Sequence, residues 1–167
     1  MNENEMIRLG IIGIGNMGSE HCRLILGGRC PETELCAVAD LREERREWAG
    51  RTLPENVKIF AAGTELIASG TCDAVLIAVP HFSHEPLAVA ALEAGLDVLC
   101  EKPAAVQADR AERMIRAAEK AGKTLTFMFN QRTNCVYRAM KQLLDSGEMG
   151  AIKRVNWIIT DWYRTQR

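Results

Sequence analysis

A glycine-rich segment near the N-terminus has the residue types and spacing of a phosphate-binding loop. It follows a strand-like apolar run, residues 7–12, and opens a helix-like stretch, residues 16–26. The first glycine of such a motif permits a tight turn, the second lets the backbone approach a pyrophosphate, and the third lets the helix pack on the strand. The N-terminus of the helix also offers N–H groups and a positive dipole to phosphates. A purely structural turn is the alternative, but this context favours dinucleotide binding by Gly13, Gly15, Asn16, Met17 and Gly18.

Asp40 ends the second apolar run, residues 35–39, and lies 22 residues after Gly18. A carboxylate at this position can accept hydrogen bonds from the ribose hydroxyls of an adenosine, and it repels a 2′-phosphate. We therefore expect NAD as the cofactor, with NADP less favoured. Asp40 can also act as the N-cap of a helix that starts at Arg42, and the two roles are compatible. The nearby arginines could weaken the cofactor preference; they are Arg42, Arg45 and Arg46.

Two further polar segments follow the fourth and fifth apolar runs, where open α/β sheets bind their ligands. The first runs from Val79 and Pro80 to His84, which begins a helix and can face a nicotinamide; a capping or surface role is the alternative. The second is Cys100-Glu101-Lys102-Pro103. A lysine there acts as a base only if it is partly desolvated or lies near positive charge, such as an oxidised nicotinamide ring. From composition alone, Lys102 reads as an exposed lysine that follows a strand.

Composition excludes several classes of protein. The chain has 167 residues, 47% of them hydrophobic and 26% charged, which is ordinary for a globular domain. The formal net charge of −1 argues against a large non-specific nucleic-acid surface. Apolar runs stay well short of the ~20 residues that cross a bilayer. Residues 1–6 are polar and acidic, unlike a signal peptide, so we expect a cytoplasmic protein that binds neither nucleic acid nor membrane.

The six cysteines are predicted to be free thiols. They form no CxxC pair, and several lie inside apolar runs, as in Val98-Leu99-Cys100. Buried free thiols are typical of cytosolic proteins. Because cysteines and histidines are not clustered, we expect no metal site.

The elements that must position these residues alternate between strand and helix. Continuous apolar runs at residues 7–12, 35–39, 57–60, 74–79, 96–100 and 125–129 predict six strands. Runs that are apolar throughout indicate strands covered on both faces, as in a parallel sheet. Helical periodicity between them, for example over residues 85–94 and 109–121, indicates right-handed crossovers. The predicted fold is therefore α/β, a doubly wound parallel sheet of Rossmann type.

The pattern changes after residue 130. Residues 133–146 read as a helix closed by Gly147, and residues 153–163 read as one long strand rich in large apolar side chains. A lone strand cannot satisfy its own ladder, so it could pair with a second copy of the chain in a homo-oligomer or fold back onto the first domain; disorder is the alternative. We expect residues 1–130 to form the dinucleotide-binding domain and residues 131–167 to begin a second, α+β domain that the chain leaves incomplete.

Taken together, these motifs resemble the Gfo/Idh/MocA family of oxidoreductases, over essentially the whole chain. The Glu-Lys-Pro triplet is the most specific element and the glycine motif the least specific. The matching positions are Gly13 to Gly18, Asp40, Val79-Pro80 with His84, Glu101-Lys102-Pro103 and Asn130-Gln131-Arg132.

The resemblance implies an enzyme that transfers hydride between NAD(P) and a hydroxyl or carbonyl carbon of a sugar, cyclitol or derivative. It implies that Val79, Pro80 and Glu101 lie at the cofactor, and that Lys102 contacts both substrate and nicotinamide, with His84 as a further catalytic candidate. An Asp and a His from the family's second domain usually complete the proton transfer. The histidines here are all in the first domain, where His21 is interpreted as a packing residue, so the chain alone should bind cofactor but turn over poorly.

Two other functions are alternatives to this one. A Rossmann core without a substrate domain could serve as a non-catalytic dinucleotide-binding or regulatory module. A Rossmann-like methyltransferase fits less well, because it does not account for Glu101-Lys102-Pro103. The substrate would be a polyol or sugar-like molecule bound by the full-length protein.

Overall fold

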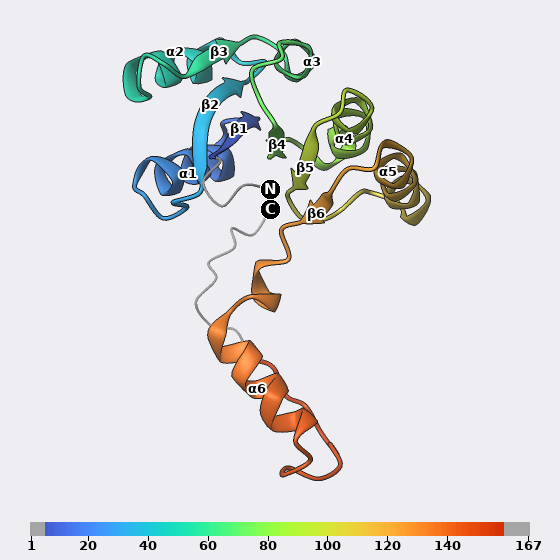
Figure 1. Cartoon of the computed structure of the whole chain (residues 1–167). Coiled ribbons are helices and arrows are strands. Elements are labelled where there is room, and N and C mark those ends of the chain that lie inside the picture. The colour runs from blue at the N-terminus through green and yellow to red at the C-terminus, as the bar shows by residue number, and fades with distance from the viewer. Residues whose placement is uncertain (1–5, 159–167) are drawn as a thin grey trace, which may run out of the picture. The chain divides into compact units, whose positions relative to one another are not determined.

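The computed structural model describes residues 6–158, and its contacts divide the chain into two units, residues 1–128 and 129–167. The first unit contains a six-stranded, fully parallel sheet with the strand order β3-β2-β1-β4-β5-β6 (Figure 1). The predicted doubly wound sheet is confirmed. Its strands are β1 (Ile7–Ile12), β2 (Thr33–Ala39), β3 (Lys58–Phe60), β4 (Ala74–Ile77), β5 (Asp97–Cys100) and β6 (Leu125–Phe127).

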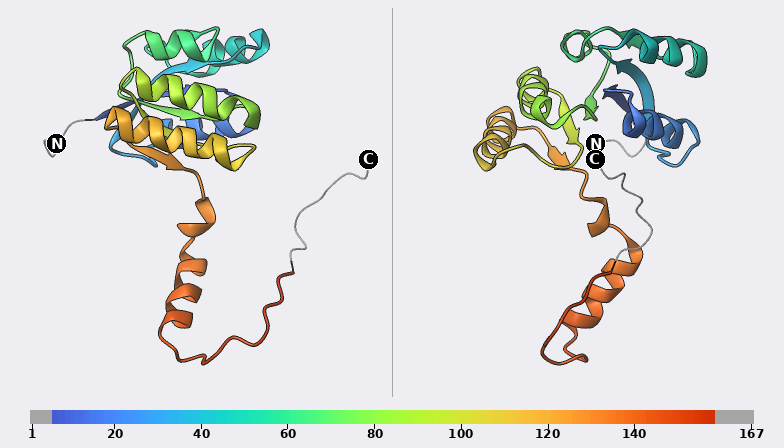
Figure 2. Two further views of the ribbon diagram at one scale, coloured as in Figure 1. Left: turned by 90° about the vertical axis from the view of Figure 1, so that its right-hand side faces the viewer. Right: turned by 180° about the vertical axis from the view of Figure 1, so that it is seen from behind.

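Helices cover both faces of the sheet. On one face, a buried cluster joins β1 and β2 to α1 (Asn16–Leu26) and α2 (Glu43–Thr52). On the other, a larger cluster joins the central strands to three helices, and Figure 2 shows α4 and α5 side by side there. These three are α3 (Gly63–Ala68), α4 (His84–Glu93) and α5 (Ala108–Ala121). Burial on both faces is why the strands are apolar throughout rather than alternating.

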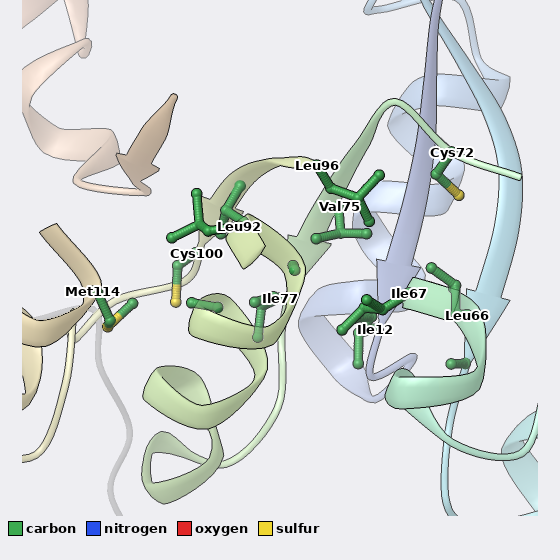
Figure 3. Close-up of a cluster of buried hydrophobic side chains, with 14 of the residues drawn as sticks. Ile12, Leu66, Ile67, Cys72, Val75, Ile77, Leu92, Leu96, Cys100 and Met114 are labelled. Atoms are coloured by element: carbon green, nitrogen blue, oxygen red, sulfur yellow. The ribbon is translucent and has the colours of Figure 1, made fainter. Parts of the chain in front are cut away.

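Single strands contribute side chains to the clusters on both faces of the sheet. Ile12 and Ile77 lie in the larger cluster, together with Leu66 of α3 and Met114 of α5 (Figure 3). Ile11, the neighbour of Ile12 on β1, lies in the other cluster, because successive side chains of a strand point to opposite faces. The sheet is thus held from both sides.

The element boundaries differ from the predicted ones mostly at strand ends. The fourth strand was expected to run to residue 79, but β4 ends at Ile77 and Pro80 precedes a short 3-10 helix, His81–Ser83. Proline has no N–H for a ladder, which limits the strand. β6 likewise ends at Phe127 instead of residue 129, and β2 begins at Thr33, two residues earlier than expected. Gly122 follows α5 in the left-handed conformation, with φ of 64°, as expected of a helix-ending glycine.

The second unit begins with a 3-10 turn, Asn130–Arg132, and contains α6 (Cys135–Asp145). The side chain of Asn134 accepts hydrogen bonds from the backbone N–H groups of Val136 and Tyr137, so α6 begins two residues later than the predicted helix. Asparagine satisfies the free donors of a first turn in this way. One face of α6 exposes large apolar side chains, namely Val136, Met140, Leu143 and Leu144.

The long strand predicted for residues 153–163 is wrong for the part that the structure describes. Residues 153–158 have no regular secondary structure, and residues 159–163 lie outside the described part of the chain. Sequence pattern gives strand propensity, but a strand exists only where a neighbouring backbone accepts its hydrogen bonds. Trp157 instead packs its ring against Tyr137 of α6, with 5.5 Å between the ring centroids. Among residues 6–158, no helix combines the length and the apolar character that a membrane span requires.

Candidate functional site

A cavity of about 790 Å³ lies at the carboxyl edge of the sheet, where the strand order reverses between β1 and β4. Crossovers leave in opposite directions at this point, so a crevice forms between them. The segments that follow β1, β2 and β4 line it, together with the first residues of α3 and α4. Five residues predicted from sequence are among the lining: Gly13, Gly15, Asp40, Val79 and Pro80.

The three glycines of the loop are required for different reasons. Gly13 has a φ of +88°, and a Cβ there would lie 2.6 Å from the carbonyl oxygen of Ala78. A Cβ at Gly18 would overlap the carbonyl oxygen of Gly13, so α1 can cross β1 closely only with glycine there. Gly15 is different, because a Cβ there would meet only Nη2 of Arg42, at 3.7 Å. The fold therefore needs Gly13 and Gly18, whereas it would accommodate a Cβ at Gly15.

Helix α1 begins at the rim of this cavity. Gly15 is its N-cap, so no side chain there takes up the free N–H groups of the first turn. Asn16 and Met17 follow, and both are exposed. Free donors and the positive end of the helix dipole together suit an anion such as a pyrophosphate.

Asp40 connects the glycine loop to the segment that follows β2. Its Oδ2 accepts a hydrogen bond from the backbone N–H of Ile14 at 2.9 Å, and its Oδ1 accepts one from the N–H of Arg42 at 2.9 Å. The side chain is only 9% exposed, and the residue lines the cavity. The alternative role of N-cap is wrong, because α2 begins at Glu43 with Arg42 at the N-cap position. The carboxylate instead holds the glycine loop through its hydrogen bond to Ile14, and Asp40 also lines the cavity.

The arginines near Asp40 take separate positions. Nε of Arg42 lies 3.6 Å from Oδ1 of Asp40, and Arg42 lines the cavity. Arg46 turns to the backbone, where its Nη1 donates to the carbonyl oxygens of Asp40 and Leu41. Of these two guanidinium groups, only that of Arg42 therefore belongs to the cavity.

His84 is fully buried and connects two loops. Its Nδ1 lies 2.9 Å from the carbonyl oxygen of Pro103, and its Nε2 lies 3.0 Å from that of Val79. The ring therefore bridges the segment after β4 and the segment after β5. Both nitrogens point at backbone oxygens, so neither is free to reach a substrate in this arrangement.

Lys102 lies at the carboxyl end of β5, with an exposed side chain and a cis peptide bond to Pro103. Glu101, just before it, is 7% exposed and accepts a hydrogen bond from the backbone N–H of Lys102 through Oε2 at 3.1 Å. Its other oxygen, Oε1, lies 2.9 Å from Nε2 of His21 on α1. His21 is thus buried, as expected of a packing residue, but it also has a polar partner that sequence reasoning missed. The two residues lie 80 positions apart, and neither carries a local signal for the contact.

The cavity has a further wall that the sequence reading did not identify. Ala62, Gly63 and Thr64, at the start of α3, also line it. A Cβ at Gly63 would lie 2.6 Å from Cγ2 of Ile12, so glycine is needed for this close approach. The side chain of Glu65 fixes the turn by accepting hydrogen bonds from the N–H groups of Ala61 and Ala62. The sequence did offer one signal for these three residues. They follow the third predicted strand, and all parallel strands end at the same edge of the sheet.

Metal ligands are not gathered anywhere in residues 6–158: no group of three or more His, Cys, Asp or Glu side chains there could hold an ion. The polar groups of the cavity include backbone donors, the carboxylate of Asp40, the guanidinium of Arg42 and the hydroxyl groups of Thr64 and Ser83. They suit an organic ligand with phosphate and hydroxyl groups.

The chain is similar to known proteins over residues 7–129 and beyond. Residues 7–129 match the Gfo/Idh/MocA family model, described as an oxidoreductase family with an NAD-binding Rossmann fold. The chain is 35% identical over 149 residues to an inositol 2-dehydrogenase of Pseudomonas savastanoi pv. phaseolicola, covering 86% of this chain and 43% of that protein. It is 36% identical over 150 residues to an inositol 2-dehydrogenase of Rubrobacter xylanophilus, covering 89% and 42%.

Solved structures give the same picture. A scyllo-inositol dehydrogenase from Lactobacillus casei, with bound NAD(H) and scyllo-inositol, superposes with a TM-score of 0.81 at 26% identity, over 87% of this chain and 43% of that one. The WlbA dehydrogenase from Bordetella pertussis, in complex with NADH and UDP-GlcNAcA, gives 0.79 at 27% identity, over 87% and 44%. The chain spans less than half the length of each of these proteins.

Proposed function

Because the chain belongs to the Gfo/Idh/MocA oxidoreductase family, whose model describes an NAD-binding Rossmann fold, we propose that it is the cofactor-binding part of an NAD-dependent dehydrogenase. The reaction is hydride transfer between nicotinamide and a hydroxyl or carbonyl carbon of a cyclitol, a sugar or a sugar derivative. The relatives named above support this substrate class. The main observation behind the proposal is that Gly15, where the fold itself does not require glycine, and the carboxylate of Asp40 line the same cavity.

The residues present fit the dinucleotide. The N–H groups at the start of α1, over Gly15, Asn16 and Met17, would hold the pyrophosphate, and Gly13 and Gly18 keep the loop tight enough to present them. Asp40 would accept hydrogen bonds from the adenosine ribose through the lone pairs that Ile14 and Arg42 leave available. When bound, the nicotinamide supplies the hydride acceptor or donor.

The carboxylate of Asp40 favours NAD over NADP, because it repels the additional phosphate of NADP. Arg42 reduces this preference, since its guanidinium lies on the same cavity and could pair with a phosphate. We expect discrimination of about tenfold rather than absolute selectivity, a difference of roughly 1.4 kcal/mol.

At the nicotinamide end, we propose that Val79, Pro80 and Glu101 shape the site and that Lys102 contacts substrate. The backbone of Lys102 is held by Glu101, which is itself held by His21. The ring of His84 lies between the carbonyl oxygens of Val79 and Pro103, with one ring nitrogen facing each, which supports a positioning role, in which it fixes the loops that carry Pro80 and Lys102. A direct proton transfer by His84 would require one of these contacts to break.

We propose that the second unit is the beginning of a substrate-binding domain, starting near residue 131. The exposed apolar face of α6 supports this, because such a face is stable in water only when other protein covers it. A second copy of the chain, in a homo-oligomer, could provide part of that cover. A cytoplasmic location is supported by the six cysteines, which are all free.

Calorimetric titration with NAD⁺ and NADP⁺ tests the proposal. The wild-type chain is expected to bind NAD⁺ saturably and NADP⁺ about tenfold more weakly, and Asp40→Ala is expected to lose that preference. Glu44→Ala removes an exposed carboxylate from nearby α2 and serves as the matched control, with the preference unchanged. If neither cofactor binds to the folded wild-type chain, the glycine loop is structural and the proposal fails.

The alternative is a non-catalytic dinucleotide-binding module, which the confinement of the cavity lining to the first unit favours. A panel of cyclitols and sugars separates the two when both this chain and a chain extended to the relatives' length are assayed for NADH production. We expect little or no steady turnover from the 167 residues alone and turnover from the extended chain. Steady turnover by the short chain contradicts the expected need for a second domain.

A further inference from the structure

Two cysteines meet on the face of the sheet that α3 covers. Sγ of Cys36, on β2, lies 3.2 Å from Sγ of Cys72, which precedes β4. Cys36 Sγ also lies 3.2 Å from the carbonyl oxygen of Leu9 on β1, so the two side chains reach toward each other across that strand. Figure 3 labels Cys72 and Leu66 on the same side of the core cluster. This pair has no part in the cofactor cavity.

Three features of the chain bring the sulfur atoms together. The β1–β2 register passes from Leu9 opposite Leu35 to Gly10 opposite Ala37, which leaves Cys36 as the extra residue of a β-bulge. A bulge re-aims a side chain. Gly10 provides the space, since a Cβ there would lie 2.7 Å from Sγ of Cys72.

The third feature is an ion pair that anchors the loop carrying Cys72. Arg8 donates from Nε and Nη2 to the two carboxylate oxygens of Asp73, at 3.0 and 2.6 Å, and its backbone N–H donates to Oδ2 at 3.0 Å. Asp73 is the direct neighbour of Cys72, so this fork fixes the cysteine beside β1. The guanidinium also places positive charge near the thiols.

The two thiols are not equivalent. The hydrogen bond from Cys72 lowers the pKa of Cys36, with a smaller contribution from the charge of Arg8. The same hydrogen bond, together with burial, raises the pKa of Cys72. The half-buried Cys36 is therefore the group that more readily becomes a thiolate, the reactive form of a cysteine.

We propose that Cys36 and Cys72 form a reversible dithiol–disulfide pair whose oxidant is a small-molecule disulfide such as oxidised glutathione. The thiolate of Cys36 attacks one sulfur of the oxidant and releases one glutathione thiolate. The sulfur of Cys72, after losing its proton to solvent, attacks Sγ of Cys36 and releases the second. The protein loses two electrons and two protons, and the oxidant becomes two molecules of glutathione.

The geometry permits the bond after a small movement. A disulfide has an S–S length of about 2.05 Å, so the sulfurs need to approach by roughly 1.2 Å. Cys36 is the extra residue of the bulge and Cys72 lies just outside β4, so neither is held at its own position by a ladder pair. The crosslink would join β2 to the segment before β4 and close a loop containing α2, β3 and α3. Cys36 is four residues before Asp40, about 13 Å along the strand, so NAD⁺ affinity should stay within about twofold.

Oxidation of the full 167-residue chain by glutathione redox buffers tests the proposal. After free thiols are blocked with an alkylating reagent, peptide mass spectrometry should find a Cys36–Cys72 linkage that dithiothreitol reverses. The melting temperature should rise by roughly 5 to 10 °C on oxidation, because the crosslink reduces the entropy of the unfolded chain. NAD⁺ titration of the oxidised chain should match that of the reduced chain.

Cys36→Ser should abolish both the linkage and the rise in melting temperature, whereas Cys30→Ser, at an exposed thiol elsewhere, should abolish neither. The proposal is overturned if oxidised wild type carries glutathione only as a mixed disulfide, or if its linkages join only other cysteines. The presence or absence of the linkage in wild type decides the question by itself, so the test still holds if Cys36→Ser folds poorly. A linkage accompanied by loss of NAD⁺ binding would overturn the separation of this pair from the cofactor site.

Discussion

The imidazole of His21 and the carboxylate of Glu101 form a buried pair, with 2.9 Å between Nε2 and Oε1. His21 is on α1, the helix that the glycine loop opens, and Glu101 follows β5 directly. Because Glu101 also accepts the N–H of Lys102, the pair connects the predicted pyrophosphate site to the predicted substrate-contacting lysine. The two ends of the proposed dinucleotide site are therefore held to one another through the interior of the domain.

His21→Ala is expected to destabilise the fold by about 2 to 4 kcal/mol, because it leaves a buried carboxylate without its main partner. Urea denaturation followed by circular dichroism measures this. Glu20→Ala, the control, removes an exposed ion pair with Arg23 on the same helix and should cost less than about 0.5 kcal/mol. Equal effects of the two variants would show that the buried pair contributes nothing beyond an ordinary surface contact.

Gly15→Ala is expected to lose NAD⁺ affinity, and Gly18→Ala is expected to lose stability. Gly15→Ala should keep its melting temperature within a few degrees, since its Cβ enters open space, yet weaken NAD⁺ binding at least about tenfold. Gly18→Ala should lose several kcal/mol of stability, because its Cβ overlaps the carbonyl of Gly13. Thermal melts and calorimetric titration separate these outcomes. Unchanged NAD⁺ affinity in Gly15→Ala would argue against ligand approach at this glycine.

His84→Ala should destabilise the domain by about 2 to 4 kcal/mol, because it opens a cavity and removes the ring that donates a hydrogen bond between the carbonyl oxygens of Val79 and Pro103. His81→Ala, at the exposed neighbouring histidine, should cost less than about 0.5 kcal/mol. Denaturant unfolding of both variants checks this. A fully stable His84→Ala would remove the support for a positioning role and return the residue to the catalytic candidates.

The buried cysteines should resist alkylation at a pH where the exposed ones react. Burial raises the pKa of Cys22 to about 11 and that of Cys100 to about 12, so few thiolates form there at pH 8. Iodoacetamide labelling followed by mass spectrometry should find Cys30 and Cys135 modified long before Cys22 and Cys100. Comparable labelling rates for buried and exposed thiols in the folded chain would contradict this.

The same two shifts predict how stability changes with pH. A raised pKa in the folded state means that folding favours the protonated thiol, so this stabilisation is complete below the ordinary value of 9.0. It decreases as the pH rises from there through about 11 for Cys22 and about 12 for Cys100, because the unfolded chain releases these protons first. Urea midpoints measured at pH 8 and pH 10.5 should therefore fall at the higher pH. A midpoint that rises would show that other groups dominate alkaline stability.

The sequence alone determined the six parallel strands, their crossovers and one side of the site. Alternating apolar runs and helical periods predicted six strands and their crossovers because strands buried on both faces must be apolar along their length. The glycine loop was also readable, since strand, tight turn and helix N-terminus are consecutive in the chain. Asp40, Val79 and Pro80 could be assigned to the cavity because every parallel strand ends at the same edge.

Tertiary structure alone decided the contacts between distant residues. The pairing of His21 with Glu101 and that of Cys36 with Cys72 depend on strand order and on a one-residue bulge, neither of which has a local signature. For the same reason, the sequence could not show that His84 is buried between the loops that follow β4 and β5. Its position near a strand end suggested a site residue instead. The predicted strand after residue 152 shows the converse. Its side chains favour extended backbone, but a ladder needs a partner strand, and whether one is present is decided outside the segment itself.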